Sequence, residues 1–124
     1  MDTHDTHQAF GYLQCCMDKR FIMQTRMAFE QATGLKDNEY WQESFPGGAA
    51  LATSLVGEDY ATGHGACIYG WSAHGSNCGG QPGVSDAESK ERLMKTIESK
   101  KLKFPTGKHF ALFVTETGVD VKEV

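Results

Sequence analysis

A short apolar run at residues 9–17 is the feature that most constrains how this chain folds. Its apolar and aromatic side chains fall on both faces of an extended chain, which is typical of a buried strand rather than an amphipathic helix. Over residues 19–33 the apolar positions then recur every three or four residues, and Gly34 follows as a helix-ending glycine. A buried strand followed directly by a helix predicts an α/β unit.

Two further apolar segments extend this pattern. Residues 66–71 and residues 109–115 have the length and composition of buried strands. A turn at residues 116–118 precedes alternating apolar and charged residues, which predicts a C-terminal β-hairpin. We therefore expect a mainly parallel central sheet flanked by helices and ending in that hairpin.

The helix signals between these strands differ in strength. Ser85 and Glu88 have the spacing of a capping box, which predicts a charged amphipathic helix that runs to about residue 99. Residues 49–55 follow a Pro-Gly-Gly breaker and are interpreted as a short helix, whereas residues 57–65 show no clear period and are interpreted as a connection.

The length of 124 residues favours one domain over residues 1–124, with a mobile polar terminus at residues 1–8 that carries His4 and His7. A formal net charge of −4 argues against a nucleic-acid partner, since such partners need a basic surface. No segment has the length of a membrane span, and the first residues lack the basic and apolar regions of a signal peptide. We expect a cytoplasmic protein.

Two half-sites for a metal follow the predicted strands. Cys16, Asp18 and Arg20 alternate at the end of the first apolar run, and His74 and Cys78 follow the second in a glycine-rich loop. Ligands of an open parallel sheet bind beyond the carboxyl ends of its strands, where both half-sites are expected to meet.

These residue types fit zinc. Zn²⁺ accepts thiolate sulfur and imidazole nitrogen in a tetrahedron, and a catalytic site keeps its fourth position for water. Asp18, held by a bidentate Arg20, would stay ionised and accept a hydrogen bond from that water. Zinc lowers the pKa of bound water towards neutrality, so the predicted site is a source of hydroxide for a small electrophile.

The other histidines and cysteines are less favoured as metal ligands. His64 is the rival of His74, but it precedes the second apolar run, and a ligand is expected after it. Cys15 and Cys67 are assigned to core packing and His109 to a structural role. In a reducing compartment such cysteines are more often ligands or core residues than disulfides.

At these motifs the chain resembles the β-class carbonic anhydrase family. The family's Cys-x-Asp-x-Arg motif is present as Cys16, Asp18 and Arg20, and its His-x-x-Cys-Gly-Gly motif is approximated by His74 and Cys78-Gly79-Gly80. His74 and Cys78 are separated by one residue more than in the family, so we expect a one-residue bulge, which Gly75 would permit.

Two further segments are similar to the family. Phe45-Pro-Gly-Gly48 is similar to its Asn-Ala-Gly-Gly turn before a helix, and the hairpin around residues 116–118 is similar to its last strands. The resemblance spans nearly the whole chain and is carried by these motifs.

The resemblance implies a β-carbonic-anhydrase-like fold and a zinc lyase that hydrates carbon dioxide reversibly to bicarbonate through zinc-bound hydroxide. It implies Cys16, His74 and Cys78 as zinc ligands, with Asp18 and Arg20 orienting the fourth ligand. In some family members the matching aspartate binds zinc itself, so the fourth ligand here is either water or Asp18. A homodimer or higher homo-oligomer is also implied, because family members build their sites at a dimer interface.

Two other functions fit the same residues. The first is a non-catalytic zinc-stapled domain in which a fourth protein ligand permanently closes the site. The second is a zinc hydrolase of a related small electrophile, carbon disulfide or carbonyl sulfide, which would use the same hydroxide.

Overall fold

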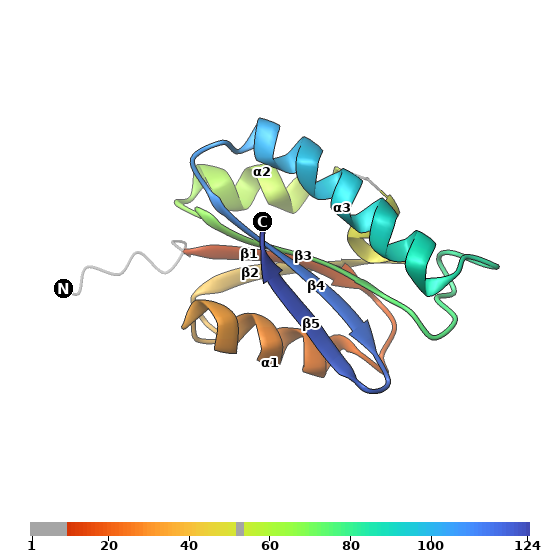
Figure 1. Cartoon of the computed structure of the whole chain (residues 1–124). Coiled ribbons are helices and arrows are strands. Elements are labelled where there is room, and N and C mark those ends of the chain that lie inside the picture. The colour runs from red at the N-terminus through yellow and green to blue at the C-terminus, as the bar shows by residue number, and fades with distance from the viewer. Residues whose placement is uncertain (1–9, 52–53) are drawn as a thin grey trace.

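A computed structural model of the chain describes residues 10–51 and 54–124, and its framework is a five-stranded sheet (Figure 1). In spatial order the strands are β2 (Tyr40–Phe45), β1 (Gly11–Cys16), β3 (Ile68–His74), β4 (Lys108–Thr115) and β5 (Gly118–Glu123). The terminus at residues 1–8, with His4 and His7, lies outside the described residues.

Helices cover both faces of this sheet. The helical elements are α1 (Ile22–Thr33), α2 (Val56–Gly63), α3 (Asp86–Lys103) and a 3-10 helix, η1 (Gly48–Leu51). Helix α1 lies on one face, while α2 and α3 lie on the other (Figure 1). None of the helices in the described residues is long and apolar enough to cross a membrane.

The expectation of an α/β fold with a C-terminal hairpin is confirmed, but the sheet is mixed and not mainly parallel. Strands β1 and β2, β1 and β3, and β3 and β4 pair in parallel, whereas β5 pairs antiparallel with β4. The physical reason is the tight turn after β4, because a short connection can only return the chain antiparallel to the strand it leaves.

The apolar runs predicted as strands are strands. All six residues of β1 are buried, as expected for a strand covered on both faces. The second run is longer than predicted, because β3 continues to His74. Its extra residues form backbone pairs with β4 as far as Val114, so tertiary pairing extends the strand beyond its apolar part.

Ser85 begins α3 and Gly34 ends α1, as predicted. Ser85 Oγ accepts a hydrogen bond from the Glu88 amide at 3.2 Å at the start of α3, which continues to Lys103 instead of ending near residue 99. Gly34 ends α1 with a left-handed φ of 76° and donates its amide to the Glu30 carbonyl.

Strand β2 and helix α2 were not predicted. Strand β2 covers a charged and aromatic segment without clear period, because it is an edge strand paired only with β1 and is half-buried. Helix α2 occupies the predicted connection, while the short helix predicted at residues 49–55 is the 3-10 helix Gly48–Leu51 in its described part. Helix α2 depends on tertiary contacts: the Gly57 amide donates to Glu43 Oε2 at 3.0 Å.

An aromatic stack fills the face under α2 and α3. Tyr69 stacks on Phe104 and on His109, with ring centroids 4.9 and 5.0 Å apart. His109 Nδ1 accepts from Trp71 Nε1 at 3.0 Å, and His109 Nε2 lies 3.0 Å from the Phe104 carbonyl oxygen. Burial lowers the pKa of His109, so the ring is neutral and bridges two elements. These contacts fit the structural role expected for His109.

A buried ionic cluster attaches α2 to α3. Glu58 is buried, and its two carboxylate oxygens each accept from Lys100 Nζ at 2.9 Å. Lys103 Nζ donates to Glu58 Oε2 at 2.8 Å, and Gln14 Nε2 reaches Oε1 from β1 at 3.4 Å. Every charge in this cluster has a partner of opposite sign, which a buried ion requires.

Replacing Glu58 with alanine is expected to lower the free energy of unfolding by about 3–5 kcal/mol, because the buried Lys100 ammonium would lose its counter-ion. The matched control is Asp59→Ala, which removes a carboxylate that is 68% exposed and is expected to change the free energy by less than about 1 kcal/mol. Urea unfolding followed by tryptophan fluorescence measures both variants. Equal losses in the two would contradict the buried role of Glu58.

Candidate metal centre

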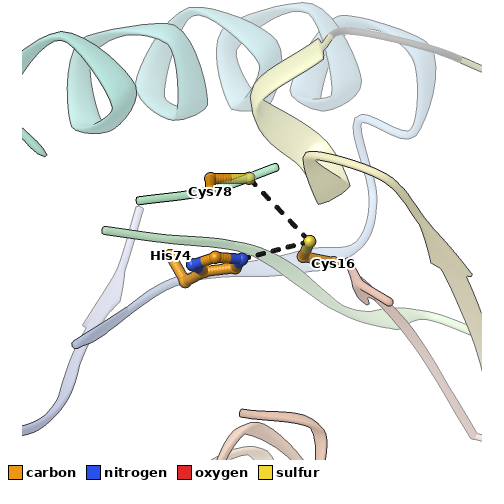
Figure 2. Close-up of side chains that lie close together, drawn as sticks. All are labelled: Cys16, His74 and Cys78. Carbon is orange, nitrogen blue, oxygen red and sulfur yellow. Dashed lines mark hydrogen bonds between the residues drawn. The ribbon is translucent and has the colours of Figure 1, made fainter. Parts of the chain in front are cut away.

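The residues of the two half-sites meet at the carboxyl ends of β1 and β3. Cys16 is the last residue of β1, and His74 is the last residue of β3. These strands are neighbours and run parallel, so their ends lie at the same edge of the sheet. Cys78 reaches the same point from the loop after β3 (Figure 2). The sequence-predicted ligands therefore form one cluster.

The three side chains are buried and close together. Cys16 Sγ lies 3.9 Å from Cys78 Sγ and 3.2 Å from His74 Nε2 (Figure 2). All three ligand atoms lie within 4.8 Å of one another. The cluster can hold a metal ion on two sulfurs and one imidazole nitrogen.

The donor set fits Zn²⁺. Zinc–sulfur bonds of ~2.3 Å and zinc–nitrogen bonds of ~2.05 Å place two tetrahedral sulfur ligands about 3.8 Å apart and a sulfur and a nitrogen about 3.6 Å apart. The observed distances of 3.9 Å between the sulfurs and 3.2 Å from Cys16 Sγ to His74 Nε2 are near those values. Thiolate and imidazole are also the ligand types that zinc prefers over magnesium or calcium.

His74 is oriented by its own loop. Its Nδ1 lies 2.6 Å from the Gly75 carbonyl oxygen, which can only accept a hydrogen bond, so Nδ1 carries a proton. With Nδ1 engaged in this way, Nε2 is the ring nitrogen that faces Cys16 Sγ. Phe21 packs against the ring, with centroids 4.8 Å apart, and fixes its plane.

Backbone from another segment completes the surroundings of Cys16. The Gly47 amide donates to Cys16 Sγ at 3.3 Å. Gly80 lies so close to this turn that a Cβ on it would be 2.3 Å from the Gly47 nitrogen. The Pro46-Gly47-Gly48 turn and the Cys78-Gly79-Gly80 segment therefore pack directly on each other.

Asp18 and Arg20 form the expected dyad beside the cluster. Arg20 Nη2 donates to Asp18 Oδ2 at 2.7 Å, and Arg20 Nε donates to both carboxylate oxygens at 3.1 Å. These hydrogen bonds are the largest cause that lowers the pKa of Asp18 to about 2. Asp18 Oδ2 lies 3.6 Å from His74 Nε2, so the ionised carboxylate lies beside one of the three ligand atoms.

The bulge expected at Gly75 is not found there, and the two residues that follow Gly75 have the unusual backbone conformation instead. Ser76 and Asn77 adopt left-handed φ angles of 56° and 65°, whereas Gly75 does not have a positive φ. Arg20 Nη2 donates to the carbonyls of Ser76 and Asn77 at 3.2 and 3.3 Å. The bulge is therefore formed by two non-glycine residues whose carbonyls point at the dyad.

Asp86 holds the other side of this loop. Its Oδ1 accepts from the Ser76 amide at 3.2 Å, and a Cβ on Gly75 would be 2.4 Å from the same oxygen. Gly75 is thus required for the close approach of a carboxylate and not for backbone conformation. The contacts of Asp86 and of the Gly47 amide with the site were not predicted, because each joins segments that are distant in the chain.

A small pocket opens onto the cluster. It has a volume of about 190 Å³ and is lined by Cys16, Met17, Asp18, Pro46, Gly79 and Gly80. Apart from the Asp18 carboxylate, this lining is apolar or consists of glycine backbone. The pocket is suited to a small uncharged molecule.

The remaining candidates lie elsewhere. His64 follows α2, where its Nδ1 lies 2.8 Å from the Tyr60 carbonyl oxygen, and it is not in the cluster. Cys15 is buried, as expected, and contacts Ser44. Cys67 is exposed, which corrects its assignment to core packing, because it precedes β3 at the rim of the sheet.

Comparison of the chain with family models, with curated proteins and with solved structures finds no match in any of the three.

If the cluster holds a metal ion such as zinc, replacing Asp86 with alanine is expected to weaken its binding by about 10- to 100-fold, because the loop that carries His74 and Cys78 loses its support. Competition with a chromophoric chelator measures the affinity. Ser85→Ala is the matched control: it removes the helix cap, costs about 1 kcal/mol of stability and leaves the loop contacts in place. An equal loss of zinc affinity in both variants would assign the effect to the helix and not to the loop.

Replacing Arg20 with glutamine is expected to raise the pKa of Asp18 from about 2 towards 3.8 in the metal-free protein, since the hydrogen bonds that hold the carboxylate ionised are lost. Because the folded-state pKa is lowered, the dyad stabilises the fold above about pH 4 and loses this effect as pH falls towards 2. Carboxyl-carbon NMR titration measures the midpoint. Lys19→Gln removes a neighbouring charge without these bonds and should leave the midpoint near that of the wild type.

Proposed function

We propose that this chain is a zinc-dependent enzyme that hydrates carbon dioxide reversibly to bicarbonate. The observation that carries the proposal is the convergence of three zinc-type ligands with an ionised carboxylate. Cys16, His74 and Cys78 form the ligand cluster, and Asp18 Oδ2 lies 3.6 Å from His74 Nε2. The resemblance of these motifs to β-class carbonic anhydrases agrees with this chemistry.

Each residue of the site would have its own role in this reaction. Cys16 and Cys78 would bring two negative charges to the metal, and His74 would bring a neutral nitrogen. When bound, zinc would supply the Lewis acidity that makes water nucleophilic near neutral pH. Asp18 would accept a hydrogen bond from that water and orient it, and Arg20 would hold the carboxylate ionised and fixed in direction.

The pocket supports the same substrate class. Carbon dioxide is small, linear and uncharged, and the 190 Å³ pocket is mostly apolar and opens beside Cys16 and Asp18. Bicarbonate is an anion, so the Asp18 carboxylate would disfavour its retention unless the bicarbonate hydroxyl donates to it. We extend the proposal to a homodimer or larger assembly in the cytoplasm, where free cysteines such as these stay reduced.

One observation favours a second function. Asp18 Oδ2 lies 3.6 Å from His74 Nε2. An oxygen and a nitrogen bound to one tetrahedral zinc would lie about 3.4 Å apart, which is close to that distance. A carboxylate that binds the metal permanently would leave no position for water. The second candidate is therefore a zinc-stapled domain without catalysis.

Purified protein is expected to contain one zinc per chain and to accelerate hydration in a stopped-flow assay with a pH indicator. Asp18→Asn should keep the zinc and lose on the order of 100-fold in turnover, because an amide cannot accept from water as a carboxylate does. The control is Asp120→Asn, an 81% exposed carboxylate on β5.

The outcomes separate the candidates. Stoichiometric zinc with no hydration above background would overturn the enzyme and support the stapled domain. Protein without zinc under conditions that supply it would overturn both. Full turnover in the Asp18→Asn variant would remove Asp18 from the mechanism.

A further inference from the structure

The two cysteines of the cluster are both buried, but they differ in access. Cys16 ends β1 and is one of the residues that line the small pocket, which gives a small reagent a route towards this residue. Cys78 is buried and does not line that pocket.

The distance between the sulfurs is short for residues so far apart in the chain. Cys16 Sγ and Cys78 Sγ are 3.9 Å apart, and a disulfide bond of about 2.05 Å requires an approach of about 1.9 Å. That approach is comparable to a side-chain rotation combined with a small loop shift. It joins two separate segments, the end of β1 and the loop after β3.

We propose that Cys16 and Cys78 form a reversible disulfide on exposure to a peroxide, and that this modification releases the metal. The inference rests on the zinc site of the proposed function, but it does not require hydration of carbon dioxide. It adds redox regulation to the same three ligands.

The chemical step balances with hydrogen peroxide as the oxidant. The Cys16 sulfur attacks one peroxide oxygen, the O–O bond breaks, and the other oxygen leaves as water, so Cys16 becomes a sulfenic acid. The Cys78 sulfur then attacks the Cys16 sulfur, the S–O bond breaks, and a second water leaves with the Cys78 proton. Two thiols lose two electrons to one peroxide and yield one disulfide and two waters.

Release of the metal follows from ligand chemistry. Zinc is bound by thiolates, and a disulfide sulfur has no such charge. Oxidation would leave His74 as the remaining nitrogen ligand beside Asp18. Reduction by a dithiol would restore both thiolates and the site.

The other two cysteines do not compete for this bond. Cys15 and Cys16 are consecutive on a strand and point to opposite faces, and Cys15 contacts Ser44 and Gln42 on its own side. Cys67 precedes β3, so it lies at the other end of the sheet from Cys16.

The test uses two variants that each keep two cysteines. Cys15→Ser with Cys67→Ser leaves Cys16 and Cys78, whereas Cys67→Ser with Cys78→Ser leaves the vicinal Cys15 and Cys16. Metal-free samples are treated with hydrogen peroxide and examined by intact mass and by peptide mapping. The variant that keeps Cys16 and Cys78 is expected to lose the mass of two hydrogens and to yield a cross-linked peptide. The variant that keeps Cys15 and Cys16 is expected to show neither change.

Two further measurements do not depend on the folding of the variants. Wild-type protein is expected to lose two of its four free thiols in a thiol titration after brief peroxide treatment. Zinc-loaded wild type should release its zinc to a chromogenic chelator under the same treatment and rebind it after addition of dithiothreitol.

Each outcome decides between the two proposals. Sulfinic acid, disulfide-linked dimers or unreacted thiols in place of the Cys16 to Cys78 bond would overturn this inference and leave the zinc enzyme intact. Disulfide formation in a chain that binds no zinc would overturn the release of metal and the proposed function, while the oxidisable pair itself would stand.

Discussion

The parallel pairing of β1 with β3 determines where every site residue lies. The ladder runs from Gly11 opposite Ile68 to Gln14 opposite Trp71. Continuing that register by two residues places Cys16 level with Ala73, one residue before His74. The ladder stops at Gln14 because Gly48 intervenes: a Cβ on Gly48 would be 2.4 Å from the Ser72 oxygen and 2.7 Å from the Cys16 nitrogen. The strand ends separate there, and the space between them becomes the ligand cluster.

Arg20 then connects the parts of the site that the sheet does not. Its guanidinium binds the Asp18 carboxylate and two carbonyls of the loop before Cys78. One side chain therefore fixes both the carboxylate beside the metal position and the loop that carries a ligand. The planar fork of arginine has enough donors for this task, and lysine at the same position would not. This geometry explains why Cys16, Asp18 and Arg20 alternate in the sequence.

The ligand residues were more predictable from the sequence than the contacts that hold them in place. Cys16, His74 and Cys78 were recognisable because strand ends and ligand types are local signals, and parallel strands bring such ends together. The preference for His74 over His64 followed from the same rule. The contacts of Gly47 and Asp86 were not predictable, since each depends on a close approach between segments distant in the chain. Strand β2 and helix α2 were missed for a related reason: partners such as Glu43, and not local pattern, stabilise them.

Contacts with Arg20 and Asp86, and not glycine, hold the loop between His74 and Cys78 in its conformation. Two successive left-handed residues without glycine cost on the order of 1 kcal/mol each, although asparagine tolerates the conformation better than most residues. The two bonds from Arg20 and the bond to Asp86 offset that cost. The loop, the dyad and the start of α3 therefore stabilise one another. A chain with the same spacing but without a carboxylate at the start of that helix would lack one of the restraints that bring Cys78 to the cluster.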